Sequence, residues 1–161
     1  MMARGFTATI LAAALAVSCG AEATGPLAAL CATRHGAEVC VDRPQYRPTQ
    51  SVTITTRNVS GDPIFKDVCA TRLVGVTNLE VDFEEFYDPR LHCGAGVTLA
   101  DIAERMVEIG PGASFEEALT LQSFAFQGYY RAHVWILDAE GRLVAETPAP
   151  SGIFEVFPSA Q

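Results

Sequence analysis

Short stretches in which apolar and polar residues alternate recur along the chain. Residues 51–56 alternate and are rich in β-branched side chains, so that Val52 and Ile54 fall on one face of a strand. Residues 79–83 alternate in the same way, and residues 128–137 show the clearest alternation of all. Because successive side chains of a strand point to opposite faces, these patterns predict β-structure.

Turn signals separate these stretches at intervals of about ten residues. The clearest are Asn-Val-Ser-Gly-Asp-Pro at 58–63, Gly-Pro-Gly at 110–112 and Asp-Ala-Glu-Gly at 138–141. Further strands are expected at residues 68–76, 115–121 and 153–157, and residues 143–145 are expected to pair back as a hairpin. Residues 99–106 fit either a short helix or a loop. About seven to nine short strands predict an all-β fold, an immunoglobulin-like antiparallel sandwich of two sheets.

The first residues have the pattern of an export signal. Arg4 precedes residues 6–17, which carry no charge and are too few to span a bilayer. This apolar stretch ends at Ser18-Cys19-Gly20, which resembles the bacterial lipobox, although Ala16 stands where leucine is commoner. In a lipobox the cysteine thiol is the nucleophile that receives a diacylglycerol. We therefore expect Cys19 to be the lipidated first residue of the mature protein.

The alternative to lipidation is ordinary cleavage after the Ala-Glu-Ala sequence at 21–23, which would remove Cys19. With lipidation, the chain divides into a signal peptide at 1–18, an anchor tether at 19–37 and one domain at 38–161. Glycine directly after the cysteine resembles lipoproteins sorted to an outer membrane, if the source has one. Without lipidation, we expect a secreted or periplasmic protein.

The remaining cysteines also indicate export. Once Cys19 is lipidated or removed, an even four remain, and four cysteines in an oxidising compartment suggest two disulfides with three connectivities. The simplest pairing joins Cys31 to Cys40 and Cys69 to Cys93. The chain has no Cys-x-x-Cys pair and no regular ligand spacing, so we expect neither a bound metal nor another cofactor.

Composition narrows the classes of partner. Hydrophobic residues make up 49% of the chain, enough for a core without membrane burial, and the formal net charge is -8. An acidic surface repels phosphate backbones, so we expect no nucleic-acid partner.

The sequence contains no recognisable catalytic set. Ser123, His133 and Asp138 supply the residue types of a hydrolase triad, but no Gly-x-Ser-x-Gly motif accompanies them, so we expect no enzyme. The candidate binding face is the polar side of the 128–137 strand, where aromatic and basic side chains alternate with core residues. Its members are Tyr129, Arg131, His133 and Trp135. The alternative for Trp135 is a structural role beneath a neighbouring loop.

The order of motifs resembles the bacterial immunoglobulin-like module of BsuPI-type proteinase inhibitors. The resemblance lies in Tyr46-Arg47-Pro48 before a strand, the 58–63 turn before a strand with Cys69, Pro-Gly-Ala-Ser at 111–114 and Gly-Tyr-Tyr-Arg at 128–131. It implies the same sandwich over residues 39–157, and protease inhibition as an activity.

Two functions follow from these observations. The first is a non-catalytic envelope lipoprotein whose domain binds or scaffolds a protein or glycan of the cell envelope, held at the membrane by its lipid. The alternative is a secreted protease inhibitor that presents a rigid loop, either 58–63 or 93–100.

The lipid anchor is tested by mass spectrometry of the mature N-terminus. We expect the first residue to be Cys19 with its acyl groups attached. A mature chain that begins at Thr24 and carries no acyl mass would contradict the lipobox assignment while leaving export intact.

Overall fold

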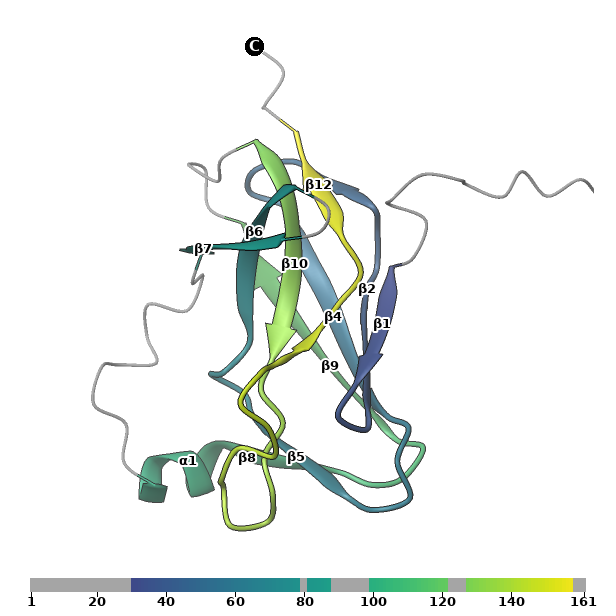
Figure 1. Cartoon of the computed structure of the whole chain (residues 1–161), viewed down its shortest axis with the longest axis vertical. Coiled ribbons are helices and arrows are strands. Elements are labelled where there is room, and N and C mark those ends of the chain that lie inside the picture. The colour runs from purple at the N-terminus through teal and green to yellow at the C-terminus, as the bar shows by residue number, and fades with distance from the viewer. Residues whose placement is uncertain (1–29, 79–80, 88–98, 122–126, 158–161) are drawn as a thin grey trace, which may run out of the picture.

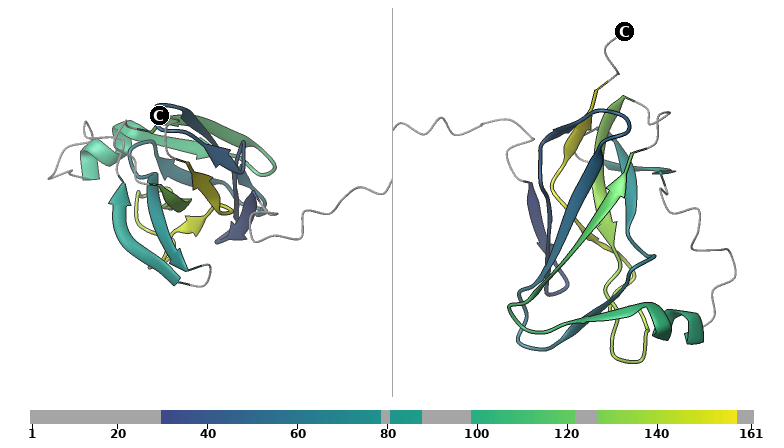
Figure 2. Two further views of the ribbon diagram at one scale, coloured as in Figure 1. Left: turned by 90° about the horizontal axis from the view of Figure 1, so that it is seen from above. Right: turned by 180° about the vertical axis from the view of Figure 1, so that it is seen from behind.

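The computed structural model describes residues 30–78, 81–87, 99–121 and 127–157. In this part of the chain two β-sheets lie face to face (Figures 1 and 2). The first sheet has the order β1-β2-β4-β9, and every pair in it is antiparallel. Its strands are β1 (Cys31–Arg34), β2 (Ala37–Val41), β4 (Ser51–Asn58) and β9 (Ser114–Thr120).

The second sheet has the order β3-β12-β10-β6-β7, with the short strand β11 also paired to β10. Its strands are β3 (Gln45–Tyr46), β6 (Arg72–Asn78), β7 (Val81–Tyr87), β10 (Gly128–Val134), β11 (Ala149–Pro150) and β12 (Phe154–Val156). A small third sheet pairs two more strands, and the helix α1 leads directly into one of them. These elements are β5 (Ile64–Asp67), α1 (Leu99–Arg105) and β8 (Met106–Ile109).

The strand order is that of an immunoglobulin-like sandwich. The series β2-β4-β9 corresponds to strands A, B and E, and β12-β10-β6 corresponds to G, F and C. The all-β, two-sheet prediction is therefore confirmed. One pair, β3 with β12, is parallel and departs from the expected antiparallel pattern. The described residues form twelve strands rather than about seven to nine, because short pieces such as β3 and β11 carry too little pattern to be seen in sequence.

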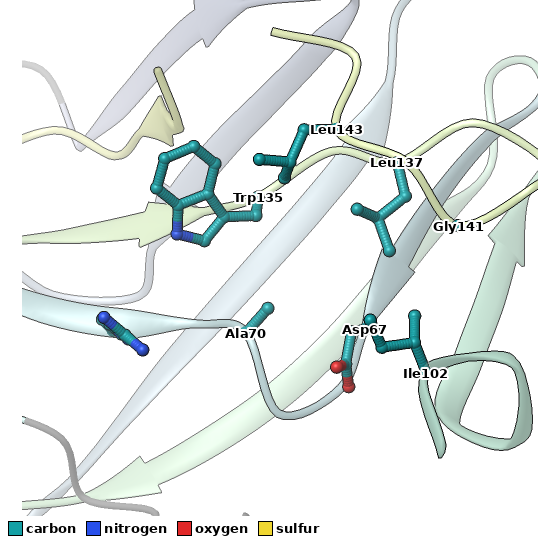
Figure 3. A pocket seen from close by; sticks show the side chains of 8 residues that line it. Asp67, Ala70, Ile102, Trp135, Leu137, Gly141 and Leu143 are labelled. Carbon is teal, nitrogen blue, oxygen red and sulfur yellow. The ribbon is translucent and has the colours of Figure 1, made fainter. Parts of the chain in front are cut away.

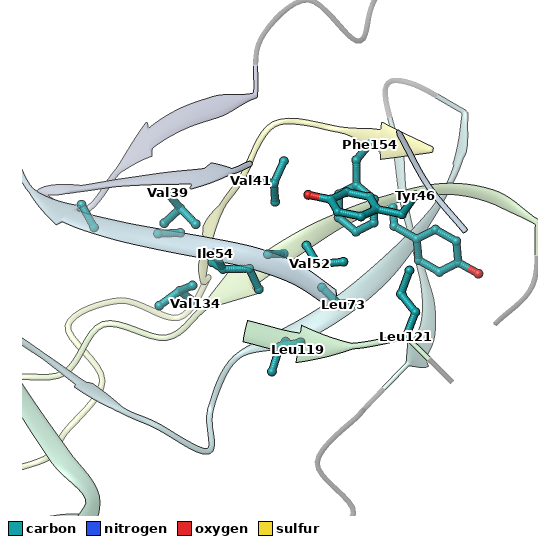
Figure 4. Close-up of a cluster of buried hydrophobic side chains, with 14 of the residues drawn as sticks. Val39, Val41, Tyr46, Val52, Ile54, Leu73, Leu119, Leu121, Val134 and Phe154 are labelled. Carbon is teal, nitrogen blue, oxygen red and sulfur yellow. The ribbon is translucent and has the colours of Figure 1, made fainter. Parts of the chain in front are cut away.

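The core fills the space between the two sheets (Figure 4). Alternate side chains of β2 and β4 point inward and are fully buried, as the alternation predicted. They meet residues of the opposite sheet, among them an aromatic pair in which the rings of Tyr46 and Phe154 lie 5.1 Å apart, edge to face. The members with no exposed surface include Ala37, Val39, Val52, Ile54, Leu73, Ala132, Val134, Ala149, Phe154 and Val156. Each large aliphatic member contributes about 1.5–3 kcal/mol through removal from water.

The first sheet begins earlier than the sequence indicated. Strand β1 lies inside residues 19–37, which were assigned to the tether. A tight turn joins β1 to β2 at His35 and Gly36, whose φ angles of 53° and 76° suit a two-residue hairpin. Cys31 and Cys40 face each other across this hairpin and form the expected disulfide. Cys69 is also disulfide-bonded, whereas Cys93 lies outside the described residues.

The expected hairpin at 143–145 is reduced to a single bridge, between Leu137 and Leu143. The pairing is limited to two backbone hydrogen bonds, from Asp138 N–H to the Arg142 carbonyl and from Val144 N–H to the Ile136 carbonyl. On its other edge, the same segment pairs with β5 through Leu137 and Phe65. The Asp138 carboxylate accepts the N–H groups of Glu140 and Arg142 at 3.0 and 2.8 Å. An aspartate that bonds the following backbone competes with strand pairing. Residues 99–105 are helical, which decides between the two alternatives left open for 99–106.

A polar corner connects β2 to β4 around Asp42. Its Oδ1 accepts the Tyr46 hydroxyl at 2.6 Å and the Thr53 N–H at 2.8 Å, while its Oδ2 pairs with Arg43 at 2.9 Å. Burial raises the pKa of the Asp42 carboxyl. The hydrogen bonds and the charge of Arg43 lower it by more than burial raises it, so the pKa lies below its ordinary value. Burial and the hydrogen bond to Asp42 raise the pKa of Tyr46.

The corner makes stability depend on the ionisation of Asp42. Because its pKa is lowered in the folded state, Asp42 contributes stability above about pH 4 and loses it as the pH falls through the folded pKa. We expect Asp42→Asn to lower the free energy of unfolding by about 1 kcal/mol at pH 7 and by much less near pH 2. Urea unfolding at the two pH values measures this difference. The control is Asp62→Asn at an exposed position, whose free energy of unfolding is expected to stay within about 0.5 kcal/mol of wild type. An effect of Asp42→Asn that is the same at pH 2 as at pH 7 would contradict a role for the ionised Asp42 carboxylate.

Candidate functional site

The predicted binding face lies on β10 and the residue that follows it. Tyr129 is 40% exposed and Arg131, His133 and Trp135 are half-buried, while the side chains between them belong to the core. Across the sheet, the first three pair with β6 in the order Val76, Val74 and Arg72. Val74 and Val76 are buried, so the face is covered along this part of β6 and is not an open aromatic patch.

Trp135 lies beyond the end of β10, where it lines a surface cleft of about 400 Å³ (Figure 3). We call this space the Trp135 cleft. Its lining comes from three parts of the chain that are distant in sequence: residues 67–72 between β5 and β6, one residue of α1, and residues 135–143 after β10. The lining residues are Asp67, Ala70, Arg72, Ile102, Trp135, Leu137, Gly141 and Leu143. A largely apolar cleft with a few charged groups at its edge has the composition of a recognition site.

The charged groups at this cleft are held in place. Asp67 is 7% exposed, and its Oδ2 accepts Arg105 Nη2 of α1 at 2.9 Å. Its Oδ1 accepts the Cys69 N–H at 2.8 Å. The carboxylate is thus neutralised and oriented by α1 and by the turn after β5. Arg72, which is exposed, is the second charged residue of the lining.

A second cleft, of about 550 Å³, lies on the other side of the loop that follows β10. It is lined by His35, Gly36, Ser60, Asp62, Pro63, Ile64, Phe65, Leu137, Asp138, Ala139 and Val144. Leu137 lines both clefts, so the loop at 138–146 separates them; we call this loop the ridge. At its surface Leu143 and Val144 are 54% and 52% exposed, and each lines a different cleft.

Sequence reasoning found Trp135 but missed the ridge. Leu143 and Val144 were assigned to a hairpin strand, where one of two adjacent residues would face inward. The available signal was the Asp-Ala-Glu-Gly-Arg segment before them, because Asp138 can close a turn on its own backbone and stop strand pairing. Nothing in the sequence indicated that Ile102 would line the cleft, because the position of α1 depends on the contact between Asp67 and Arg105.

The residues considered for a hydrolase triad have other roles or lie outside the described part of the chain. Within it, no three His, Cys, Asp or Glu side chains gather as a metal site, and no helix is long and apolar enough to cross a membrane. Asp138 is engaged in its own turn, His133 is half-buried on β10, and Ser123 lies outside the described residues. Cys19, Cys93 and most of the 93–100 loop also lie outside them.

No protein-family model matches the chain, and no curated protein is significantly similar to it in sequence. Among solved structures, the class 5 fimbriae chaperone CfaA is 16% identical over 76% of this chain, with a TM-score of 0.41. A chain of the chaperone–tip adhesin complex of CFA/I fimbriae is 14% identical over the same share, with a TM-score of 0.40. This chain spans 57% of the length of each of those two chains.

A Niemann-Pick type C2 protein from Japanese carpenter ant is 6% identical over 75% of this chain and 89% of its own, with a TM-score of 0.36. Likenesses at this level indicate neither a family nor an activity. The assignment of the fold rests on the strand order of the chain itself.

The ion pair at the Trp135 cleft is tested by Arg105→Ala. The substitution leaves the mostly buried Asp67 carboxylate without its guanidinium, so we expect a loss of about 1–2 kcal/mol in the free energy of unfolding. Arg57→Ala is the matched control, because Arg57 is 56% exposed and reaches Glu38 only at 4.0 Å. The control is expected to change stability by less than about 0.5 kcal/mol. Equal effects of the two substitutions in urea unfolding would show that the Asp67 pair does not hold α1.

Proposed function

We propose that this protein is a non-catalytic, lipid-anchored protein of the cell envelope whose immunoglobulin-like domain binds a partner protein through the Trp135 cleft and the ridge. The observation that carries the proposal is the pair of apolar clefts flanking two adjacent, half-exposed aliphatic residues, Leu143 and Val144. Exposed apolar groups beside a partly buried tryptophan form the kind of surface that supplies most of the energy in protein interfaces.

The direction of β1 supports this arrangement. The strand runs from Cys31 toward the end of the sandwich that carries the clefts, where His35 lines the second cleft (Figure 1). A chain anchored at Cys19 would therefore enter the domain from the opposite end. The intervening twelve residues reach at most about 40 Å when extended. A tether of this length would hold the domain within about 40 Å of the membrane while leaving the clefts accessible.

The lining of the clefts favours a protein segment over a glycan as the partner. The walls are aliphatic on several sides, with Leu137, Leu143 and Ile102 around a single indole ring. A sugar ring would stack on the indole but would leave its hydroxyl groups facing aliphatic carbon, which costs free energy unless they are paired. We infer a partner segment that inserts one or two large apolar side chains beside Trp135, with an acidic group near Arg72.

Protease inhibition is the second candidate, and the loop at 58–63 favours it. Buried Asn58 donates to the carbonyl oxygens of Asp62 and Ile109, both at 2.8 Å, and its Oδ1 accepts the N–H and hydroxyl of Ser60. This network holds the loop rigidly while Val59 at its tip is 46% exposed. A rigid exposed loop is the feature by which an inhibitor would limit the entropy cost of binding.

The binding proposal is tested by capture of partners from envelope extract, followed by affinity measurements on the identified partner. We expect Trp135→Ala and Leu143→Ser each to weaken binding by about 30-fold, the effect of losing a residue that dominates an interface.

Val59→Ser is the matched control for this experiment, because it removes an aliphatic side chain of similar exposure outside both clefts. It should leave the affinity unchanged. If Val59→Ser instead abolishes stoichiometric inhibition in a panel of serine proteases, and the cleft variants retain it, the inhibitor function replaces the binding function. If the affinity is lost only when glycans are removed enzymatically from the partner, the ligand is a glycan.

A further inference from the structure

Lys66 is the only lysine in the chain, and its side chain has no exposed surface. It lies on β5, and its Nζ is in direct contact with Oε1 of Glu117 on β9. The Glu117 side chain is only 6% exposed. The contact joins the small β5–β8 sheet to the first sheet of the sandwich, between residues 51 positions apart in sequence.

The surroundings hold these two groups in a fixed arrangement. Thr71 Oγ1 accepts a hydrogen bond from Lys66 Nζ at 2.9 Å and donates one to Glu117 Oε1 at 2.6 Å. The ring of Phe115 covers the amine from 5.0 Å. An amine and a carboxyl group are thus kept in contact, with a hydroxyl bridging them and an aromatic ring excluding solvent from one side.

Burying a charged pair this far from solvent costs free energy. Removing an ammonium and a carboxylate from water carries a desolvation penalty that their mutual attraction offsets only in part. Transfer of one proton within the pair would produce a neutral amine and a neutral carboxylic acid. That form is the reactive one, because a free amine is a nucleophile and a protonated carboxyl group can lose water.

We propose that Lys66 and Glu117 condense to an intramolecular amide, so that the mature domain carries a covalent bond between β5 and β9. The nitrogen lone pair of Lys66 attacks Cδ of Glu117, and the Nζ–Cδ bond forms. The Thr71 hydroxyl stabilises the negative charge that develops on Oε1. The Cδ–Oε2 bond then breaks, and Oε2 leaves as water with one proton from the nitrogen and the proton it already held.

The reaction balances without any further reagent. One amine and one carboxylic acid give one amide and one water molecule, and no atom is oxidised or reduced. Permanent contact supplies the high effective concentration that a condensation in water lacks. Burial protects the product, because water returns to a site covered by Phe115 only when the domain opens.

The single lysine makes the experiment direct. The full-length protein is purified from a host that exports it, then denatured and reduced so that disulfides play no part. A lysine-specific protease cuts the unmodified chain once, after Lys66, and leaves the amide-linked chain whole, because the enzyme requires a free lysine amine. We expect an uncut chain. Trypsin should likewise release one product that joins residues 58–72 to 106–131, about 18 Da lighter than the sum of its unlinked parts.

Two variants complete the test. Glu117→Ala removes the acceptor carbon, so its denatured chain should be cut after Lys66 and show no loss of mass. Glu116→Ala, on the neighbouring exposed position of β9, should behave as wild type. A wild-type chain that is cut to completion, with all tryptic peptides at full mass, would overturn the proposal. This result does not depend on the binding proposal, because Trp135→Ala is expected to leave both the cleavage and the mass unchanged.

Discussion

Leu137 and Phe65 exchange two backbone hydrogen bonds, and the end of the domain that carries both clefts depends on that exchange. The Leu137 N–H donates to the Phe65 carbonyl at 2.8 Å, and the Phe65 N–H donates to the Leu137 carbonyl at 3.2 Å. The pair ties the segment after β10 to β5, which belongs to a different sheet. On its other edge the same segment bonds the ridge, from Asp138 N–H to the Arg142 carbonyl and from Val144 N–H to the Ile136 carbonyl, so Leu137 lies between β5 and the ridge.

The same pairing sets the environment of three neighbouring side chains. Leu137 becomes the wall shared by both clefts, and Trp135 is left at the end of the sheet beside one of them. On β5, Lys66 follows Phe65 and therefore points to the opposite side, into the interior beside Glu117. The contact between β5 and the segment after β10 thus lies beside both clefts and next to the chain's single, buried lysine.

The domain combines an ordinary apolar core with buried polar groups at its periphery. The core between the sheets is built of aliphatic residues with Tyr46, Tyr130 and Phe154 (Figure 4). Among the described residues, polar groups are buried at Asn58, where β4 ends, and around Lys66 and Glu117, within β5 and β9. Buried polar groups need specific partners, so these sites define the connections between sheets more sharply than apolar packing does.

The sequence by itself determined the sandwich and the strands β4, β9 and β10, because alternation encodes them. It suggested the disulfide between Cys31 and Cys40 as the simplest of three connectivities. It also singled out Trp135 as a candidate, although not the cleft that this residue lines. Tertiary structure decided the parallel pairing of β3, the reduction of the 143–145 hairpin to a single bridge and the meeting of Lys66 with Glu117. Each of these depends on contacts between residues far apart in the chain, such as Phe65 with Leu137, and no local pattern records which distant backbone or side chain will be the partner.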